Sequence, residues 1–174
     1  MTTLRKGHSY TNVKRAYTRK SKFKTKGYVK AIPPSKLVRY DMGDLKKSFP
    51  YRVDLVSKQP IQVRHNSLES GRLVVSRRLS LDLGNNYFFK VRVYPHHVLR
   101  ENKMITGAGA DRMQTGMQRA FGRAVGIAAQ LKTKQKVFSV YVEETDVQKA
   151  KDALHKAFSR MPGKYGIEVE KVIQ

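Results

Sequence analysis

The sequence predicts an α+β domain preceded by a basic extension. Short segments alternate apolar and polar residues, which is the period of half-buried strands, and two longer segments have the spacing of amphipathic helices. With 174 residues, 40% of them hydrophobic, the chain is long enough to close one core of modest size. We therefore expect a basic arm over residues 1–30 and a single α+β domain over residues 31–174.

Strands are predicted where apolar and polar residues alternate, at residues 37–42, 51–56, 61–65, 89–94 and 167–172. Residues 137–142 are predicted to form a buried strand because they are rich in β-branched and aromatic residues. A first helix should have Asn66 or Ser67 as its N-cap and end near Leu83, because glycine and asparagine follow. The residues expected on its buried face are Leu68, Val75 and Leu79.

A second helix is predicted after the strand at 137–142. Thr145 and Gln148 have the spacing of a capping box, and acidic residues precede the positive end of the helix. Pro162 and Gly163 should end it. Its expected apolar stripe is Val147, Ala150, Leu154, Ala157 and Phe158.

Residues 102–122 are too rich in glycine for ordinary core and too basic for an ordinary loop. Glycine adopts left-handed conformations cheaply and lets backbone N–H groups approach an anion. Arginine and lysine side chains surround these donors, so the segment is predicted to lie against phosphate. Its methionines suit either a core or a surface that packs against irregular RNA.

Charge indicates a polyanionic partner. Lys and Arg number 36 against 13 Asp and Glu, a net charge of +23, and residues 1–30 contain no acid. The excess is not carried by one amphipathic helix, which favours nucleic acid over a membrane surface. From residue 143 onward acids balance bases, so the charge should be one-sided. The arm either orders on RNA, with its aromatic residues stacking on bases, or is a basic tail without a fixed target.

The sequence shows no recognisable catalytic, metal-binding or nucleotide-binding motif. The chain has no cysteine, and His96 and His97 are neighbours that would point in opposite directions on an extended segment. Gly107 and Gly109 begin a dinucleotide-like pattern, but Arg112 replaces its third glycine. Asp41 and Asp44 are interpreted as a turn around Gly43. We therefore expect no enzyme, cofactor, metal or small-molecule substrate.

No apolar run of membrane-spanning length and no apolar N-terminal signal occur in the sequence. A soluble, intracellular protein without a membrane partner is expected.

Residues 103–122 read KMITGAGADRMQTGMQRAFG, and residues 91–100, which precede them, read VRVYPHHVLR. These motifs closely resemble the large-subunit ribosomal protein family L-ten-e, the archaeal and eukaryotic counterpart of bacterial L-sixteen. The resemblance covers the chain from about Pro34 onward. From Val140 the chain is similar to the archaeal form, and residues 1–30 match only as a basic arm.

The resemblance implies a two-layer sandwich of the hammerhead type, with a mixed β-sheet and two main helices. It implies a cytoplasmic, non-catalytic constituent of the large ribosomal subunit, near the peptidyl transferase centre, with rRNA, tRNA and neighbouring ribosomal proteins as partners. The glycine-rich loop near 102–118 would reach toward tRNA. Its tRNA-proximal residues would be Lys103, Gly107, Gly109, Arg112, Gln114, Gly116 and Arg119.

The rRNA is expected to contact the basic arm and one basic face of the domain. The predicted contact residues are Arg5, Lys6, Lys14, Arg15, Arg19, Lys20, Lys22, Lys24, Lys26, Arg72, Arg77, Arg78, Lys90, Arg92 and Arg100. The alternative is an architectural nucleoid protein that binds duplex DNA through the same charge, although wedge residues and dimer-forming elements are not evident. An RNA-modifying enzyme is a third possibility that lacks a recognisable cofactor site.

Overall fold

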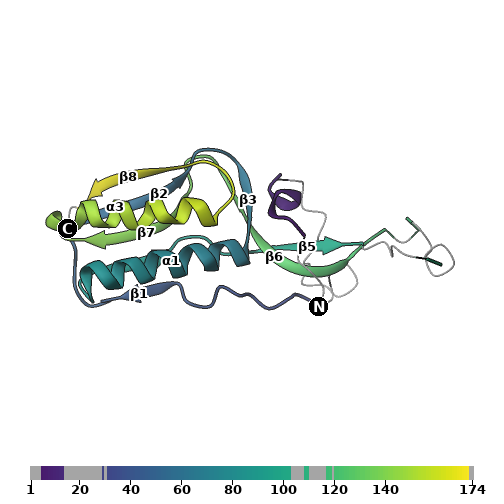
Figure 1. Ribbon diagram of the computed structural model, residues 1–174, viewed down its shortest axis with the longest axis horizontal. Helices are drawn as coiled ribbons and strands as arrows, with labels where there is room; N and C mark the ends of the chain where they lie inside the picture. The colour runs from purple at the N-terminus through teal and green to yellow at the C-terminus, as the bar shows by residue number, and fades with distance from the viewer. Residues whose placement is uncertain are drawn as a thin grey trace.

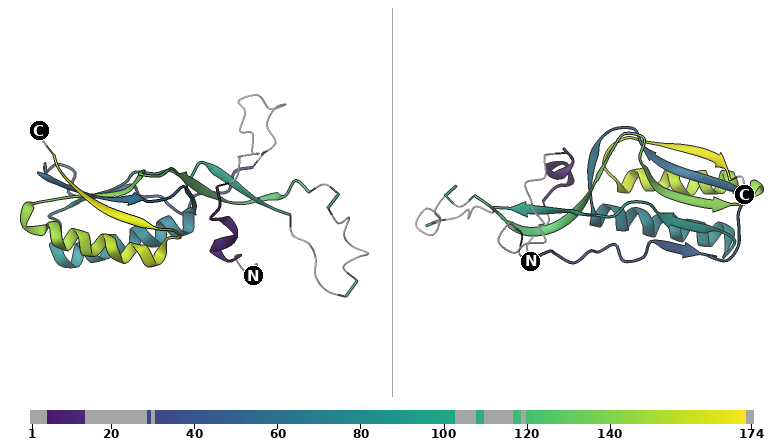
Figure 2. Two further views of the ribbon diagram at one scale, coloured as in Figure 1. Left: turned by 90° about the horizontal axis from the view of Figure 1, so that it is seen from above. Right: turned by 180° about the vertical axis from the view of Figure 1, so that it is seen from behind.

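The computed structural model describes residues 5–13, 29, 31–102, 108–109, 117–118 and 120–172. Within these ranges, two helices lie side by side over a five-stranded sheet, and a three-stranded sheet extends from one end of this body (Figure 1). The turned views in Figure 2 show the helices and the larger sheet as two layers. The α+β class and the layered arrangement are confirmed.

All neighbouring strands in the two sheets run antiparallel, where a mixed sheet was expected. The larger sheet has the order β1 (Asp41–Gly43), β4 (Phe88–Val91), β7 (Lys136–Val142), β2 (Tyr51–Ser57) and β8 (Tyr165–Lys171). The smaller sheet has the order β3 (Ile61–Arg64), β6 (Arg123–Leu131) and β5 (His97–Glu101).

The core lies between the helices and the larger sheet. Helix α1 (His65–Leu83) and helix α3 (Val147–Lys156) both bury the stripes that the sequence predicts. A 3-10 turn, η4 (Ala157–Arg160), continues α3. Burying an aliphatic or aromatic side chain contributes about 1.5–3 kcal/mol, so these stripes account for the docking of the helices. The largest fully buried side chains include Leu55, Leu68, Leu79, Phe89, Phe138 and Leu154.

Both predicted helix caps are wrong. Helix α1 follows β3 without a loop, and Arg64 at its N-cap makes no capping side-chain bond in the described part of the chain. Pairing of β3 with β6 extends through Arg64, so the backbone enters the helix before Asn66 or Ser67 can cap it. Thr145 lies inside a 3-10 turn, η3 (Glu144–Asp146), ahead of α3. Gln148 donates its side-chain N–H to Asp152 instead.

The strand predictions hold at 51–56, 61–65, 137–142 and 167–172 within a residue or two. Of residues 37–42 only the last two join β1. Strand β4 ends at Val91, because the chain then leaves the larger sheet to form β5 in the smaller one. Strands β5 and β6 were not predicted. Strand β6 consists largely of small residues, which give no alternating pattern and have a low β-propensity. Its pairing with β3 and β5 stabilises it as a strand.

The turn expected around Gly43 is not formed: Asp41–Gly43 is strand β1, and the chain bends at residues 45–47, just after it. Gly43 has φ +89°, and a Cβ built there would lie 2.1 Å from the backbone oxygen of Tyr87. The Asp44 N–H donates to that same oxygen at 2.8 Å, and the Asp44 carboxylate accepts the N–H of Lys46 at 2.9 Å. Glycine is required here both by the positive φ and by the close approach.

His65 begins α1 in its neutral form. Its Nδ1 accepts the backbone N–H of Lys36 at 3.1 Å. The pKa of His65 lies below its ordinary value of 6.5, because burial disfavours the charged ring and because Lys36 and Arg64 add positive charge nearby.

This lowered pKa predicts a pH-dependent stability. The unfolded chain takes up the proton first, so the contribution of His65 is fully present above pH 6.5 and is lost as the pH falls through its lowered folded pKa. His65→Asn keeps an acceptor without this titration and should flatten the free energy of unfolding between pH 7 and pH 5. Denaturant titrations at several pH values measure it. The variant His155→Asn, at an exposed position of α3, is the control and should keep the wild-type slope.

Candidate nucleic-acid interface

An N-terminal 3-10 turn, η1 (Gly7–Tyr10), docks on the free edge of β3. The backbone N–H of Gln62 donates to the Thr11 carbonyl at 2.9 Å, and its side-chain amide donates to the Tyr10 carbonyl at 2.8 Å. Arg64 Nη1 donates to the Arg5 carbonyl at 3.1 Å. Residues 5–13 are thus attached to the domain by hydrogen bonds to their backbone carbonyls, which a composition without acids does not suggest.

Basic side chains from three separate segments gather around this turn. The Arg64 guanidinium lies 5.2 Å from the centre of the Tyr10 ring, and the Arg100 guanidinium lies 3.9 Å from that of Phe121. Arg5 pairs with Glu101, with 3.7 Å between Nε and Oε2. Stacking on aromatic rings orders a guanidinium without using its N–H donors, so those donors that make no bond within the protein stay available for phosphate.

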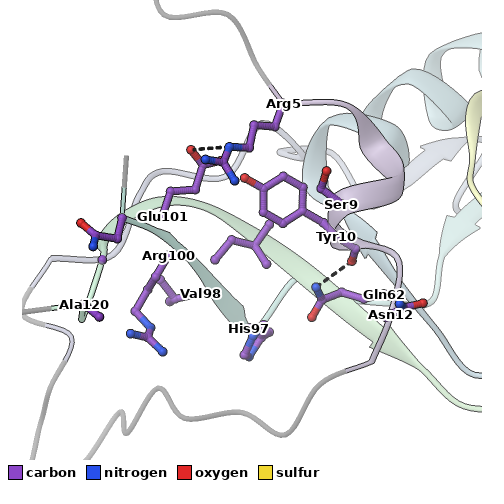
Figure 3. A pocket seen from close by; sticks show the side chains of 13 residues that line it. Arg5, Ser9, Tyr10, Asn12, Gln62, His97, Val98, Arg100, Glu101 and Ala120 are labelled. Carbon is purple, nitrogen blue, oxygen red and sulfur yellow. Dashed lines mark hydrogen bonds and ion pairs between the residues drawn. The ribbon is translucent and has the colours of Figure 1, made fainter. Parts of the chain in front are cut away.

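Three hollows lie among these side chains. A cavity of about 370 Å³ opens between η1, strand β5 and the residues just before β6 (Figure 3). A more apolar groove of about 660 Å³ is lined by Ile32, Pro33 and Phe121 together with Arg100 and Arg123. A third hollow, of about 320 Å³, is bordered by residues that include His8, Arg64, Ser67 and Arg160.

Strands β5 and β6 bring together the two ends of the glycine-rich segment, Glu101–Asn102 and Ala120–Gly122, which we call the loop root. A Cβ built on Gly122 would lie 2.3 Å from the carbonyl carbon of Glu101 and 2.5 Å from the backbone nitrogen of Asn102. Only glycine allows the two backbones to come this close. The loop root lines both the 370 Å³ cavity and the groove, so it is part of the basic surface.

The predicted rRNA residues do not form one face. Successive residues of a strand point to opposite faces of the sheet. Phe138 contacts α1 at Gly71, so its neighbour Ser139 lies on the face away from α1. Lys90 pairs with Ser139 in the β4–β7 register and therefore lies on that same face. Lys90 therefore lies on the opposite side of the sheet from Arg77 and Arg78. Lys90 also pairs with Asp41, at 3.7 Å.

Arg72 is turned inward. Its side chain is 9% exposed, donates to the Glu69 carboxylate with Nε at 2.8 Å and Nη2 at 2.5 Å, and lies 3.0 Å from the sulfur of Met42. The hydrogen bonds to Glu69 raise the pKa of Arg72, although burial opposes them. Arg78 pairs with Asp82 at 2.6 Å, while Arg77 and Arg92 are exposed.

Many predicted residues lie outside the described ranges. From the arm these are Lys14, Arg15, Arg19, Lys20, Lys22, Lys24 and Lys26, and from the loop Lys103, Gly107, Arg112, Gln114, Gly116 and Arg119. Gly109 is described and has φ +78°, a conformation that glycine adopts most readily. Arg5 and Lys6 are exposed beside η1.

The sequence analysis missed Arg64 and Arg160, which border the same hollow as His8. Each follows an ordinary strand or helix pattern and carries no motif of its own. Only the docking of η1 against β3 brings them to one place, so no local signal could have identified them.

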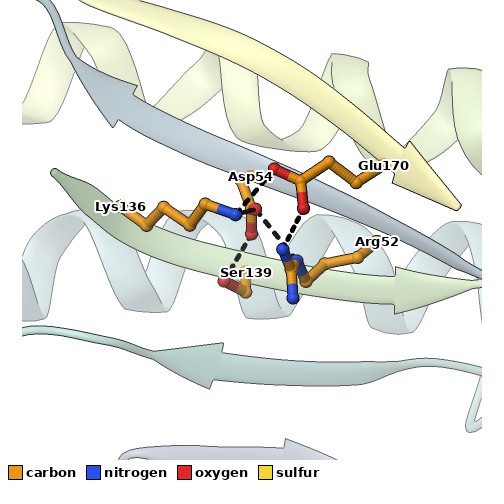
Figure 4. Close-up of polar contacts among 5 residues, drawn as sticks. All are labelled: Arg52, Asp54, Lys136, Ser139 and Glu170. Atoms are coloured by element: carbon orange, nitrogen blue, oxygen red, sulfur yellow. Dashed lines mark hydrogen bonds and ion pairs between the residues drawn. The ribbon is translucent and has the colours of Figure 1, made fainter. Parts of the chain in front are cut away.

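The most buried polar cluster lies elsewhere, on the sheet face away from the helices (Figure 4). Asp54 is fully buried and accepts from Ser139 Oγ at 2.6 Å, Arg52 Nε at 2.9 Å and Lys136 Nζ at 2.7 Å. Glu170 pairs with both Arg52 and Lys136. The hydrogen bond from Lys136 holds the pKa of Glu170 below its ordinary value, although desolvation opposes it.

A serine, an aspartate and a lysine in contact suggest catalysis, but the Ser139 hydroxyl donates a hydrogen bond to Asp54, and Asp54 and Ser139 are fully buried. None of the hollows described above includes them. The cluster neutralises a buried carboxylate and joins β2, β7 and β8.

Among the described residues, no three side chains of His, Asp or Glu gather as metal ligands would. No helix in the same ranges has the length and apolar character needed to cross a bilayer.

Residues 13–168 match the family model of ribosomal protein L16p/L10e, which is most of the chain. The chain belongs to the ribosomal protein L16p/L10e family. It is therefore a structural constituent of the large ribosomal subunit, with rRNA and other ribosomal proteins around it. The expectation drawn from residues 91–122 is confirmed at the level of the family.

Several archaeal proteins are relatives of this L16p/L10e chain. It is 44% identical over 168 residues to the large ribosomal subunit protein uL16 of Methanosphaerula palustris, covering 95% of this chain and 94% of the relative. It is 46% identical over 170 residues to the uL16 of Methanospirillum hungatei, covering 96% of each. The uL16 of Staphylothermus marinus is 43% identical over 161 residues, covering 91% of this chain and 89% of that protein.

Proposed function

We propose that this L16p/L10e protein binds large-subunit rRNA through the surface formed by η1, the smaller sheet and the loop root. Arginines at positions 5, 64, 100, 123 and 160 border the hollows of this surface, and they come from segments far apart in the sequence. This convergence of basic side chains on a surface of hollows is the observation that carries the proposal. Such a surface positions a protein on RNA through phosphate contacts, without reading sequence directly.

The rest of the molecule supports the choice of face. The open face of the larger sheet carries acids beside its bases, with Asp54 and Glu170 neutralising Arg52 and Lys136. At the start of α3, Asp146 of η3 pairs with Lys149. A surface whose charges cancel gains little from counterion release, so rRNA should bind at the opposite end of the molecule.

The loop near 102–118 would then extend from the bound surface toward tRNA. The root holds both ends of this segment together, so rRNA bound there fixes where the loop starts. Its basic residues, including Lys103, Arg112 and Arg119, would contact tRNA phosphates. The arm from Lys14 to Lys26 would add further rRNA contacts, and the protein would support peptide-bond formation by positioning RNA near the peptidyl transferase centre.

The rRNA contacts are tested by the salt dependence of binding. The triple variant Arg5→Ala, Arg100→Ala, Arg123→Ala should lower the slope of log K against log salt by about 2–3, because each lost phosphate contact removes about 0.7–0.9. Filter binding of purified full-length chain to large-subunit rRNA at several salt concentrations measures the slope.

The matched control removes the same charge from the other end of the molecule, with Lys46→Ala, Lys149→Ala, Lys171→Ala. It should keep the wild-type slope within experimental error. Equal losses in the two triple variants would contradict the proposed face. Tighter binding of duplex DNA than of structured rRNA at the same salt would instead support an architectural DNA-binding role.

A further inference from the structure

The 370 Å³ cavity between η1 and the loop root has the size of a site for a small planar group. Pockets that hold small molecules span about 300–1,000 Å³, so this one lies near the lower limit. It is lined by Arg5, Tyr10, Arg100, Glu101 and Asn102, among others (Figure 3). These residues offer both hydrogen-bond donors and an acid, in a surface that is otherwise basic.

Two polar groups that line the cavity lack a hydrogen-bond partner among the described residues. The Tyr10 hydroxyl is buried and unpaired there. The Glu101 side chain is 8% exposed, and its ion pair with Arg5, at 3.7 Å, is too long for a hydrogen bond. Figure 3 shows the hydroxyl end of Tyr10 pointing toward the Arg5–Glu101 pair. Buried groups of this kind normally find a partner, so the cavity is suited to a ligand that donates hydrogen bonds.

The acid determines which part of an RNA can enter. A phosphate would be repelled by the carboxylate of Glu101, whereas a base edge that carries N–H groups would be attracted to it. Among the standard bases, guanine presents two adjacent N–H donors, N1–H and N2–H, which match the two oxygens of a carboxylate. RNA-binding proteins commonly recognise unpaired bases by hydrogen bonds to this edge.

We propose that the cavity binds one unpaired guanine of the rRNA. Glu101 accepts from the guanine edge, and the Tyr10 hydroxyl bonds to a further polar atom of the base. Arg5, whose side chain is 55% exposed, remains at the rim for the neighbouring phosphates. The inference rests on the proposed rRNA binding and adds base recognition to a surface otherwise built for phosphate.

The test uses kethoxal, which modifies N1 and N2 of unpaired guanines. Large subunits stripped of this protein are rebuilt with the full-length chain as wild type, Glu101→Gln, Tyr10→Phe or the control Glu168→Gln. Glu168 is an exposed acid on β8, so its variant makes the same charge change away from the cavity. Wild type and control should protect one guanine from kethoxal. With Glu101→Gln the reactivity of this guanine should rise about tenfold, and with Tyr10→Phe it should rise by a smaller factor.

The outcomes separate this inference from the function on which it rests. If the chain fails to bind the stripped subunits, both proposals are overturned. If it binds but the guanine reactivities are the same with wild type and Glu101→Gln, the guanine site alone is overturned. Saturable binding of GMP to the free chain, lost in Glu101→Gln and without any guanine protection in rRNA, would assign the cavity to a free nucleotide and likewise overturn it.

Discussion

Replacing Asp54 with alanine is expected to lower the free energy of unfolding by about 3 kcal/mol. The substitution leaves Arg52 and Lys136 together with Glu170 as their remaining partner, and it leaves Ser139 Oγ without its acceptor. The cost is placed at the low end of the range for buried pairs, because the Arg52 and Lys136 side chains are 21% and 28% exposed and retain some water. Urea titration at pH 7 measures it.

The control is Glu168→Ala, which removes an exposed acid directly opposite Asp54 in the β2–β8 register. Surface changes of this kind stay within about 0.5 kcal/mol. Combining Asp54→Ala with Lys136→Met should recover part of the loss, because one of the uncompensated charges is removed. If Asp54→Ala costs no more than Glu168→Ala, the cluster does not stabilise the fold as described.

Gly122→Ala is expected to reduce peptide synthesis by rebuilt large subunits on the order of tenfold, since small misplacements of positioning groups are costly. The added Cβ would lie within 2.3 Å of the Glu101 backbone, so β5 and β6 must separate at the loop root. Forcing extra volume into such a contact costs about 1–3 kcal/mol, and local opening of the strand ends relieves it. The loop would then start from a different place. A translation assay with purified subunits, corrected for subunit yield, measures the effect.

Gly126→Ala, four residues further on in β6, is the matched control. Its Cβ would meet the nearest atom, Nε2 of His65, at 3.6 Å, which is an ordinary contact. This variant should translate as wild type does. Normal translation with Gly122→Ala, at a normal content of the protein in the subunit, would show that the close approach at the root does not serve the loop.

The elements whose patterns are strong were predictable. The stripe of Leu68, Val75 and Leu79 identifies α1, the alternation at residues 51–56 identifies β2, and the β-branched and aromatic residues at 137–142 identify β7. The bend lies at residues 45–47 rather than around Gly43, because the pairing of β1 with β4 keeps Asp41–Gly43 in the strand. The caps and the strands β5 and β6 were not predictable, since their positions depend on partners distant in sequence.

The candidate site likewise has features that the sequence predicts and features that only the structure shows. The glycine-rich motif and the excess of basic residues are enough to indicate RNA and the family, because both are visible in the order and kind of the residues. The inward turn of Arg72 toward Glu69 and the separation of Lys90 from Arg77 could not be foreseen, because a charged residue in an amphipathic pattern is expected to face solvent.

Fold class, family and polyanionic partner all follow from the amino-acid sequence, because composition, periodicity and a long motif are properties of the chain that need no folding partner. Which side chains meet follows only from the tertiary structure. A register shift after Leu55 places Lys136 opposite Val56, on the same face as Asp54, and the edge of β3 brings Tyr10 into reach of Arg64. Such side-chain contacts depend on backbone pairing between segments distant in sequence, and this pairing cannot be deduced from local sequence patterns.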